Sequence, residues 1–194
     1  MSAEPTSTLH RFDPTPLIDR LERVEHVLPA MARIASEADA KWKPAPSDRF
    51  PSGAWSILEI CCHMLYEETE DFRTRLRLTQ EDPAAPWPGW DPEGHAVRER
   101  YNEQSLPVVL DAWVRERKAS VRWLRELVSS GRADWFVAYN HPRVGPVRAG
   151  VLLVGWAAHD ALHLRQISKR LFELAERDGK GPGFETDYAG KWGA

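Results

Sequence analysis

The sequence has few cysteines, no long apolar run and no excess of positive charge. Its two cysteines, Cys61 and Cys62, are adjacent, which places them poorly for a disulfide with each other, so we expect a reducing, cytoplasmic location. No stretch of 18 apolar residues occurs, and we therefore expect no transmembrane helix and no membrane partner. The net charge of −3 argues against a nucleic-acid partner, which would require clustered positive charge.

A chain of 194 residues is long enough to bury a substantial core as one domain. The first segment, MSAEPTSTLHRF, has the composition of a loose tail and lacks the basic and apolar blocks of a signal peptide. The last segment, KGPGFETDYAGKWGA, is rich in glycine. The expected organisation is a flexible tail at 1–12, a folded domain at 13–179 and a second tail at 180–194.

Apolar residues recur every three to four positions in four segments, which is typical of amphipathic helices. We expect these helices at 17–39, 56–80, 106–129 and 148–177. Pro29 predicts a kink or a break in the first helix. Ser56 and Glu59 form the S-x-x-E pattern of a capping box, which predicts that the second helix begins at Ser56.

The connections between these helices are irregular. Residues 81–105 are rich in proline and predict a long crossover with a short helix at about 92–104. Residues 130–147 contain WFVAY, which has a strand-like composition, but one short run without a partner predicts no sheet. The expected fold is therefore all-α, an antiparallel four-helix bundle with a long crossover between its second and third helices.

Three of the seven histidines lie in segments that should be buried. His159 and His163 are four residues apart in a helix that is apolar almost all round, from 150 to 173, so we expect a buried central helix. Histidines at this spacing share one face and can both bind one metal ion. His63, beside the apolar stripe of the second helix, is the candidate third ligand. His10 falls in the tail, and the remaining histidines are expected to be exposed: His26, His95 and His141.

A buried histidine can also be a hydrogen-bonded core residue without a metal. The i,i+4 pair alone fits both interpretations, and the third histidine favours the metal because unpaired polar groups are costly in a core. The metal interpretation requires His63 to lie at the same depth in the bundle as the pair.

Several neighbours of the three histidines are further candidates. Glu67, one turn after His63, fits four roles: a fourth ligand, a general base, a group that supports a ligand through a hydrogen bond, or a solvated helix residue. Gln166, one turn after His163, could hydrogen-bond a ligand or a bound cofactor or substrate. Asp160 points about 100° away from the ligand face and should form a salt bridge or a cap. We expect core packing, rather than a role at a pocket mouth, for three tryptophans: Trp55, Trp90 and Trp156.

Three motifs together resemble the DinB-like/YfiT-like superfamily of small metal-binding four-helix bundles. They are W-[ST]-x-x-E-x-x-x-H at Trp55 to His63, H-P-x-x-G at His141 to Gly145, and H-D-x-x-H-L-x-Q-I at His159 to Ile167. The resemblance covers roughly residues 50–171. It implies that one divalent metal ion, most often nickel or zinc with iron and manganese as alternatives, is bound by His63, His159 and His163. It also implies a homodimer.

The resemblance further implies an enzyme that acts on a small-molecule substrate. The leading expectation is transfer of a low-molecular-weight thiol to an electrophile in detoxification, and the alternative within the enzyme class is a metal-dependent hydrolase. A third hypothesis is non-catalytic: the metal stabilises the bundle, and the protein binds a small molecule or a partner. Three protein ligands leave a coordination position open, which favours the catalytic hypotheses.

Overall fold

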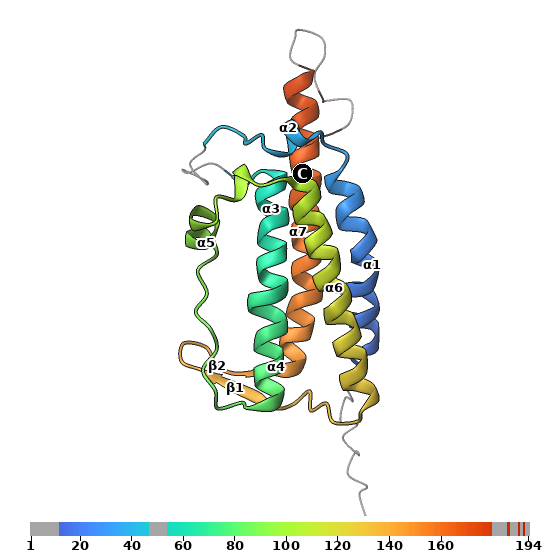
Figure 1. The fold of residues 1–194 in the computed structure, drawn as a ribbon, viewed down its shortest axis with the longest axis vertical. Helices are drawn as coiled ribbons and strands as arrows, with labels where there is room; N and C mark the ends of the chain where they lie inside the picture. Colours follow the sequence, from blue (N-terminus) through green and yellow to red (C-terminus); the bar gives the residue numbers. More distant parts are fainter. Residues whose placement is uncertain (1–11, 47–53, 180–185, 187–189, 191, 193–194) are drawn as a thin grey trace, which may run out of the picture.

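The computed structural model describes residues 12–46, 54–179, 186, 190 and 192, and its long helices form a four-helix bundle (Figure 1). The first helix is α1, Thr15–Ala32. The second is a continuous column of α3, Ile57–Tyr66, the π-helix η1, Glu67–Phe72, and α4, Arg73–Glu81. The third is α6, Leu106–Ser129, and the fourth is α7, Ala149–Asp178. The predicted all-α bundle is confirmed.

The long crossover determines the directions of the helices. Residues 82–105 return along the length of the bundle, so α6 runs in the same direction as α3, while α1 and α7 run the opposite way (Figure 1). The crossover carries α5, Pro92–Arg98, and the short 3-10 helix η2, Tyr101–Glu103. Asp91 caps α5 by accepting a hydrogen bond from the backbone N–H of Gly94 over 2.9 Å.

One predicted helix end, the start of α3, agrees with the structure, and another, the end of α1, does not. The capping box is present: Ser56 Oγ accepts from the Glu59 N–H over 3.1 Å, and Glu59 Oε2 accepts from the Ser56 N–H over 2.8 Å. The first helix, however, ends at Ala32 rather than near 39, with Pro29 in its last turn, and the chain turns before the extended Ser36. Residues 37–40 form a separate helix, α2, Glu37–Ala40, capped by Ser36.

The expectation that no sheet forms was wrong. Strand β1, Ala138–His141, pairs antiparallel with β2, Gly145–Arg148, in a hairpin. The partner lies only a few residues further on, but it contains Pro146, which gives it the composition of a loop. Gly145 follows the turn with φ at 78°, a conformation that favours glycine.

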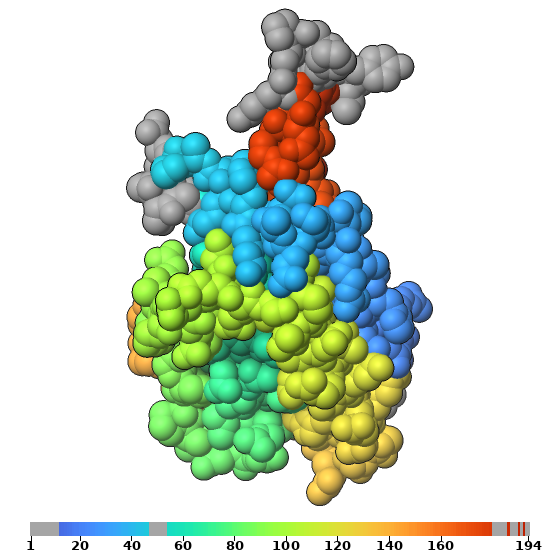
Figure 2. Space-filling model, turned by 45° about the horizontal axis from the view of Figure 1, so that its top comes forward, coloured from blue at the N-terminus to red at the C-terminus, as the bar shows by residue number. Residues whose placement is uncertain are grey.

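Helix α7 is not buried on all sides, which corrects the expectation of a central helix. Val151, Val154 and Leu162 are 57%, 47% and 49% exposed, and they lie on one face. Each helix of a four-helix bundle occupies a corner, so each keeps a face toward solvent. The last turns of α7 also project beyond the other helices (Figure 2). No helix among the described residues is long and apolar enough to cross a membrane.

Two apolar clusters fill the bundle, one toward each end. Between them, every one of the four helical columns carries buried polar or charged residues. On α6, for example, Arg117 lies between Trp113 and Val121, and on α7 Asp160 and His163 lie between Trp156 and Ile167. A polar layer therefore crosses the middle of the core, where unpaired groups would be costly. The expected tails at 1–12 and 180–194 lie almost wholly outside the described residues.

Candidate metal centre

The three histidines singled out in the sequence meet in this polar layer. His63 comes from α3, and His159 and His163 come from successive turns of α7. The Nε2 atom of His159 lies 3.3 Å from Nε2 of His63 and 2.9 Å from Nε2 of His163. One potential ligand atom from each ring lies within 4.8 Å of the other two. His63 therefore lies at the same depth in the bundle as His159 and His163, as the metal interpretation requires.

This arrangement fits a metal ion. Nitrogens bound to one metal at about 2.0–2.1 Å lie about 3 Å apart, whether the geometry is tetrahedral or octahedral. The separations of His159 Nε2 from the Nε2 atoms of His63 and His163 are in that range. Three imidazole nitrogens at this spacing cannot each receive a proton from a neighbour, whereas one cation satisfies all three lone pairs.

Gln166 determines which nitrogen of His163 is available. The Nδ1 atom of His163 lies 2.8 Å from Gln166 Oε1. An amide oxygen accepts and does not donate, so Nδ1 carries the proton and Nε2 presents its lone pair to the other histidines. Gln166 thus contacts a candidate ligand, as its spacing predicts. His63 Nδ1 is buried and has no hydrogen-bond partner within the described ranges.

Burial keeps the three rings neutral. It lowers the pKa of His63 to about 3, of His159 to about 2 and of His163 to about 4. The neighbouring histidines lower the pKa of His63 and His159 further, because two positive charges would repel one another. Neutral imidazole is the form that binds metals, so the cluster needs no deprotonation at neutral pH.

The π-helix η1 places Glu67 beside His63. Glu67 is 3% exposed, which excludes its interpretation as a solvated helix residue. Its Oε1 lies 3.7 Å from His63 Nδ1 and accepts a hydrogen bond from Trp90 Nε1 over 2.9 Å. Burial, followed by the hydrogen bond and charge of Asp71, raises the pKa of Glu67 to about 8. π-turns inside helices are frequent at functional sites.

Aromatic rings surround the cluster. The ring of Trp55 packs on His63 with centroids 4.8 Å apart, and Phe72 meets the His159 ring edge-on at 5.1 Å. Trp156 is buried, as expected, and stacks on Phe72. Trp90 is 55% exposed, so the expectation of core packing was wrong for this residue. Its indole is held at the surface by the bond to Glu67 rather than by burial.

Two histidines outside the cluster are more enclosed than expected. His95, half-buried on α5, places its Nδ1 2.6 Å from Tyr101 Oη and its ring 4.0 Å from that of Tyr66. His141, half-buried in the hairpin, lies against Trp87 at 6.0 Å between ring centroids. The contacts of His95 with Tyr66 and of His141 with Trp87 join segments remote in sequence, which explains why local polarity did not predict them. His26 is exposed, and His10 lies outside the described residues.

The two cysteines are core residues. Both are buried free thiols. Burial raises the pKa of the Cys61 thiol well above its ordinary value and that of Cys62 to about 12. Both thiols are therefore protonated at neutral pH and unsuited to bind a metal.

Asp160 forms the salt bridge expected of it. Its carboxylate accepts from Arg117 Nη1 over 2.5 Å and from Nη2 over 2.9 Å. Arg117 was not predicted as a buried residue. The signal was present, because Arg117 continues the inward-facing spacing from Trp113 to Val121 on α6. An arginine on an apolar helix face indicates a buried acidic partner, although sequence does not identify which one.

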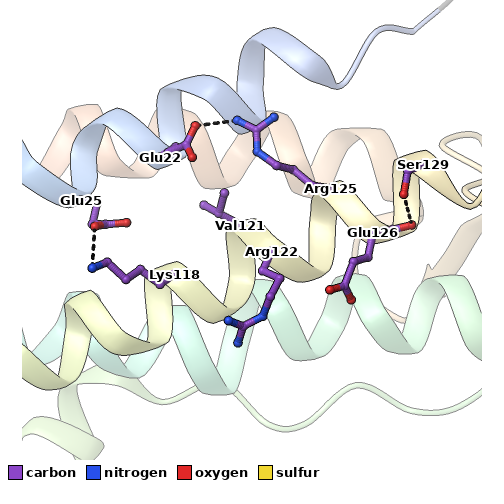
Figure 3. Close-up of a pocket in the computed structure, with 8 residues that line it drawn as sticks. All are labelled: Glu22, Glu25, Lys118, Val121, Arg122, Arg125, Glu126 and Ser129. Carbon is purple, nitrogen blue, oxygen red and sulfur yellow. Dashed lines mark hydrogen bonds and ion pairs between the residues drawn. The ribbon is translucent and has the colours of Figure 1, made fainter.

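A groove between α1 and α6 is separate from the histidine cluster (Figure 3). It has a volume of about 450 Å³ and is lined mainly by charged side chains, four of which pair across it. Arg125 binds Glu22 over 2.5 Å, and Lys118 lies 3.4 Å from Glu25 (Figure 3). The groove therefore offers mainly satisfied ion pairs, and the chemistry of the molecule is concentrated between α3 and α7.

Comparison with known proteins decides the family. The family model that describes the sequences of the DinB superfamily matches residues 20–167. The chain belongs to the DinB superfamily. The match spans all three histidines of the cluster, in agreement with the motifs that suggested the family.

A solved structure supports the same fold for this DinB-superfamily protein. The YfiT protein from Bacillus subtilis, described as a probable metal-dependent hydrolase with an unusual four-helix bundle topology, matches with a TM-score of 0.64. The two sequences are 14% identical, and the match covers 88% of this chain and 94% of YfiT. At this identity the likeness establishes the fold. No curated protein sequence matches the chain.

Proposed function

We propose that this DinB-superfamily protein is a metal-dependent hydrolase whose divalent metal ion is held by His63, His159 and His163. The observation that carries the proposal is the convergence of three neutral imidazoles beside a buried carboxylate. A divalent metal with three histidine ligands supplies Lewis-acid chemistry and makes water a nucleophile near neutral pH. The description of YfiT as a probable metal-dependent hydrolase points in the same direction. Nickel and zinc are the leading candidates, and three imidazoles also accept iron or manganese.

Glu67 is the proposed general base. Its Oε1 lies 3.7 Å from His63 Nδ1 and is accessible to a donor from the crossover, since Trp90 Nε1 bonds to it. A cation bound to the histidines would lower the pKa of Glu67, and the resulting carboxylate could support His63 from its Nδ1 side or accept a proton from a nucleophile. Gln166 keeps His163 in the tautomer that presents Nε2, and Trp55 and Phe72 shield the rings from bulk water.

Transfer of a low-molecular-weight thiol to an electrophile is the second enzymatic proposal. A divalent metal held by the three histidines could bind a thiolate as well as a hydroxide, and Glu67 would take the thiol proton. The non-catalytic hypothesis predicts instead that the carboxylate has no role. The three-histidine ligand set favours catalysis, since a site that only stabilises the bundle is usually closed by four protein ligands.

The test compares Glu67→Gln with Glu70→Gln. Both glutamates lie in η1, but Glu70 is exposed. The probes are p-nitrophenyl acetate for hydrolysis and, for thiol transfer, glutathione or mycothiol with 1-chloro-2,4-dinitrobenzene. Hydrolysis that requires metal, and that falls about 100-fold in Glu67→Gln while Glu70→Gln keeps it, supports the hydrolase. The same pattern only with the thiol pair supports thiol transfer. Equal rates with and without metal for both probes contradict an enzyme of either kind.

A further inference from the structure

One arginine joins all four helical columns of the bundle. Arg117 on α6 is fully buried. Its Nε and Nη2 donate to Glu68 Oε2 over 3.0 and 2.8 Å, and its Nη1 donates to the backbone oxygen of Leu21 on α1 over 3.0 Å. The remaining bonds form the bidentate pair with Asp160 on α7. Trp156 Nε1 also donates to Glu68 Oε2, over 3.1 Å.

The two carboxylates in this network each adjoin a residue of the candidate metal centre. Asp160 directly follows His159 on α7, and Glu68 directly follows Glu67 in η1. Successive helical residues point about 100° apart. The turn that presents His159 to the metal therefore presents Asp160 to Arg117, and the turn that carries Glu67 likewise presents Glu68 to Arg117.

A planar guanidinium is suited to hold both turns at one separation. Its donors have fixed directions, so bonds to two carboxylates fix the rotation and spacing of the segments that carry them. Small changes in this spacing would move His159 Nε2 relative to His63 Nε2, which lie 3.3 Å apart. Metal affinity depends on such distances to within a few tenths of an ångström.

We propose that Arg117 is a positioning residue for the metal centre, and that its bonds to Asp160 and Glu68 hold His159 and Glu67 in register with His63. This inference rests on the proposed metal site. It assigns to a charged residue outside the ligand set a role in metal affinity, in addition to its contribution to folding.

Two substitutions break the bidentate pair from opposite sides. Arg117→Lys keeps the charge but replaces the fork with a single donor point that cannot bridge both carboxylates. Asp160→Asn keeps the guanidinium, but its amide NH2 group would face one of the Arg117 N–H donors. It also leaves one buried cation facing one buried anion, so it remains a folded test if the lysine variant fails to fold. Leu124→Ala is the matched control, because Leu124 is fully buried on α6 in an apolar cluster.

The readouts are the dissociation constant for Zn²⁺ by competition with a chelator, the visible spectrum of Co²⁺ in the site, and the melting temperature of the metal-free protein. We expect Asp160→Asn and Arg117→Lys to weaken Zn²⁺ binding about tenfold or more and to change the Co²⁺ spectrum. Leu124→Ala should lower the melting temperature and leave both metal readouts as in the wild type. Zn²⁺ affinities within about twofold of wild type in the folded variants overturn the inference, as does an equal loss in Leu124→Ala. A wild type that binds neither ion overturns the proposed function itself.

Discussion

Trp90 donates a hydrogen bond from its indole Nε1 to Oε1 of Glu67 over 2.9 Å, although Trp90 is 55% exposed and Glu67 is buried. This bond links the crossover to the candidate centre, because Glu67 Oε1 lies 3.7 Å from His63 Nδ1. A large ring left in solvent is unusual unless its polar end has a partner. The crossover is thus tied to a residue that adjoins the histidines.

Trp90→Phe should therefore speed metal exchange. The ring remains, but the N–H donor to Glu67 is lost, and a hydrogen bond to a carboxylate of roughly 1.5 kcal/mol corresponds to about a tenfold change in rate. The measurement is the rate at which a chelator extracts Zn²⁺. Trp123→Phe, at a half-buried position on α6, is the control and should exchange like wild type. Equal rates in all three proteins would show that the bond does not limit access.

Gln166→Ala should weaken metal binding with little effect on folding. Gln166 is exposed, so its loss should change the free energy of unfolding by less than about 0.5 kcal/mol. It is also the acceptor that holds the proton on His163 Nδ1. Removing such a partner typically lowers metal affinity by about tenfold or more. Gln166→Glu, which keeps an acceptor, should retain affinity. An alanine variant that binds Zn²⁺ as tightly as wild type would contradict the assigned tautomer.

Much of the fold followed from the sequence because its signals were local. The capping box at Ser56 and the apolar spacing of residues 106–129 depend on neighbours within a few positions, and both were confirmed. The hairpin was missed because Pro146 masks the second strand, and the outer face of α7 because bundle geometry, not hydropathy, decides which side is exposed.

Part of the candidate metal centre could also be predicted from the sequence. The spacing of His159 and His163 and the apolar surroundings of His63 predicted that the three would meet. The partners of the histidines were harder to predict. The bond from Trp90 to Glu67 spans 23 residues and the pair of Arg117 with Asp160 spans 43. Both depend on how the crossover and the helices pack, which no local pattern encodes.

Acid should destabilise the metal-free protein in a defined window. The unfolded chain binds protons on His63, His159 and His163 near pH 6.5, whereas the folded protein binds them only near pH 2–4. The unfolded state therefore holds more protons between these limits, and stability falls as pH falls below about 6.5. Glu67 acts in the opposite sense, because its raised pKa of about 8 means that protonation from pH 8 to 4.5 stabilises the fold.

Three histidine rings oppose the single carboxyl of Glu67. We therefore expect the free energy of unfolding to rise slightly as the pH falls from 9 to 7, and then to decrease toward pH 4. Urea unfolding at a series of pH values measures this dependence. His159→Asn removes one of the three titrating rings and should flatten the decrease below pH 6.5. A flat profile for the metal-free wild type between pH 6.5 and 4.5 would show that the rings are not buried as described.

The capping box provides a stability test away from the metal centre. Ser56 Oγ accepts from the Glu59 N–H and donates to Asn102 Oδ1 over 2.7 Å, so it ties the start of α3 to the crossover. Ser56→Ala should lower the free energy of unfolding by about 1–2 kcal/mol. Ser36→Ala, at the cap of the short and exposed α2, should cost less. A larger loss at Ser36 in urea unfolding would contradict this assignment.

The metal content of the purified protein tests the central claim most directly. Elemental analysis should find about one nickel, zinc, iron or manganese ion per chain in the wild type and in His26→Ala, since His26 is exposed and outside the cluster. His63→Ala should lose that metal while remaining folded by circular dichroism. A wild type that holds no metal after reconstitution, or a His63→Ala variant that keeps a full equivalent, would contradict a metal site built from these three histidines.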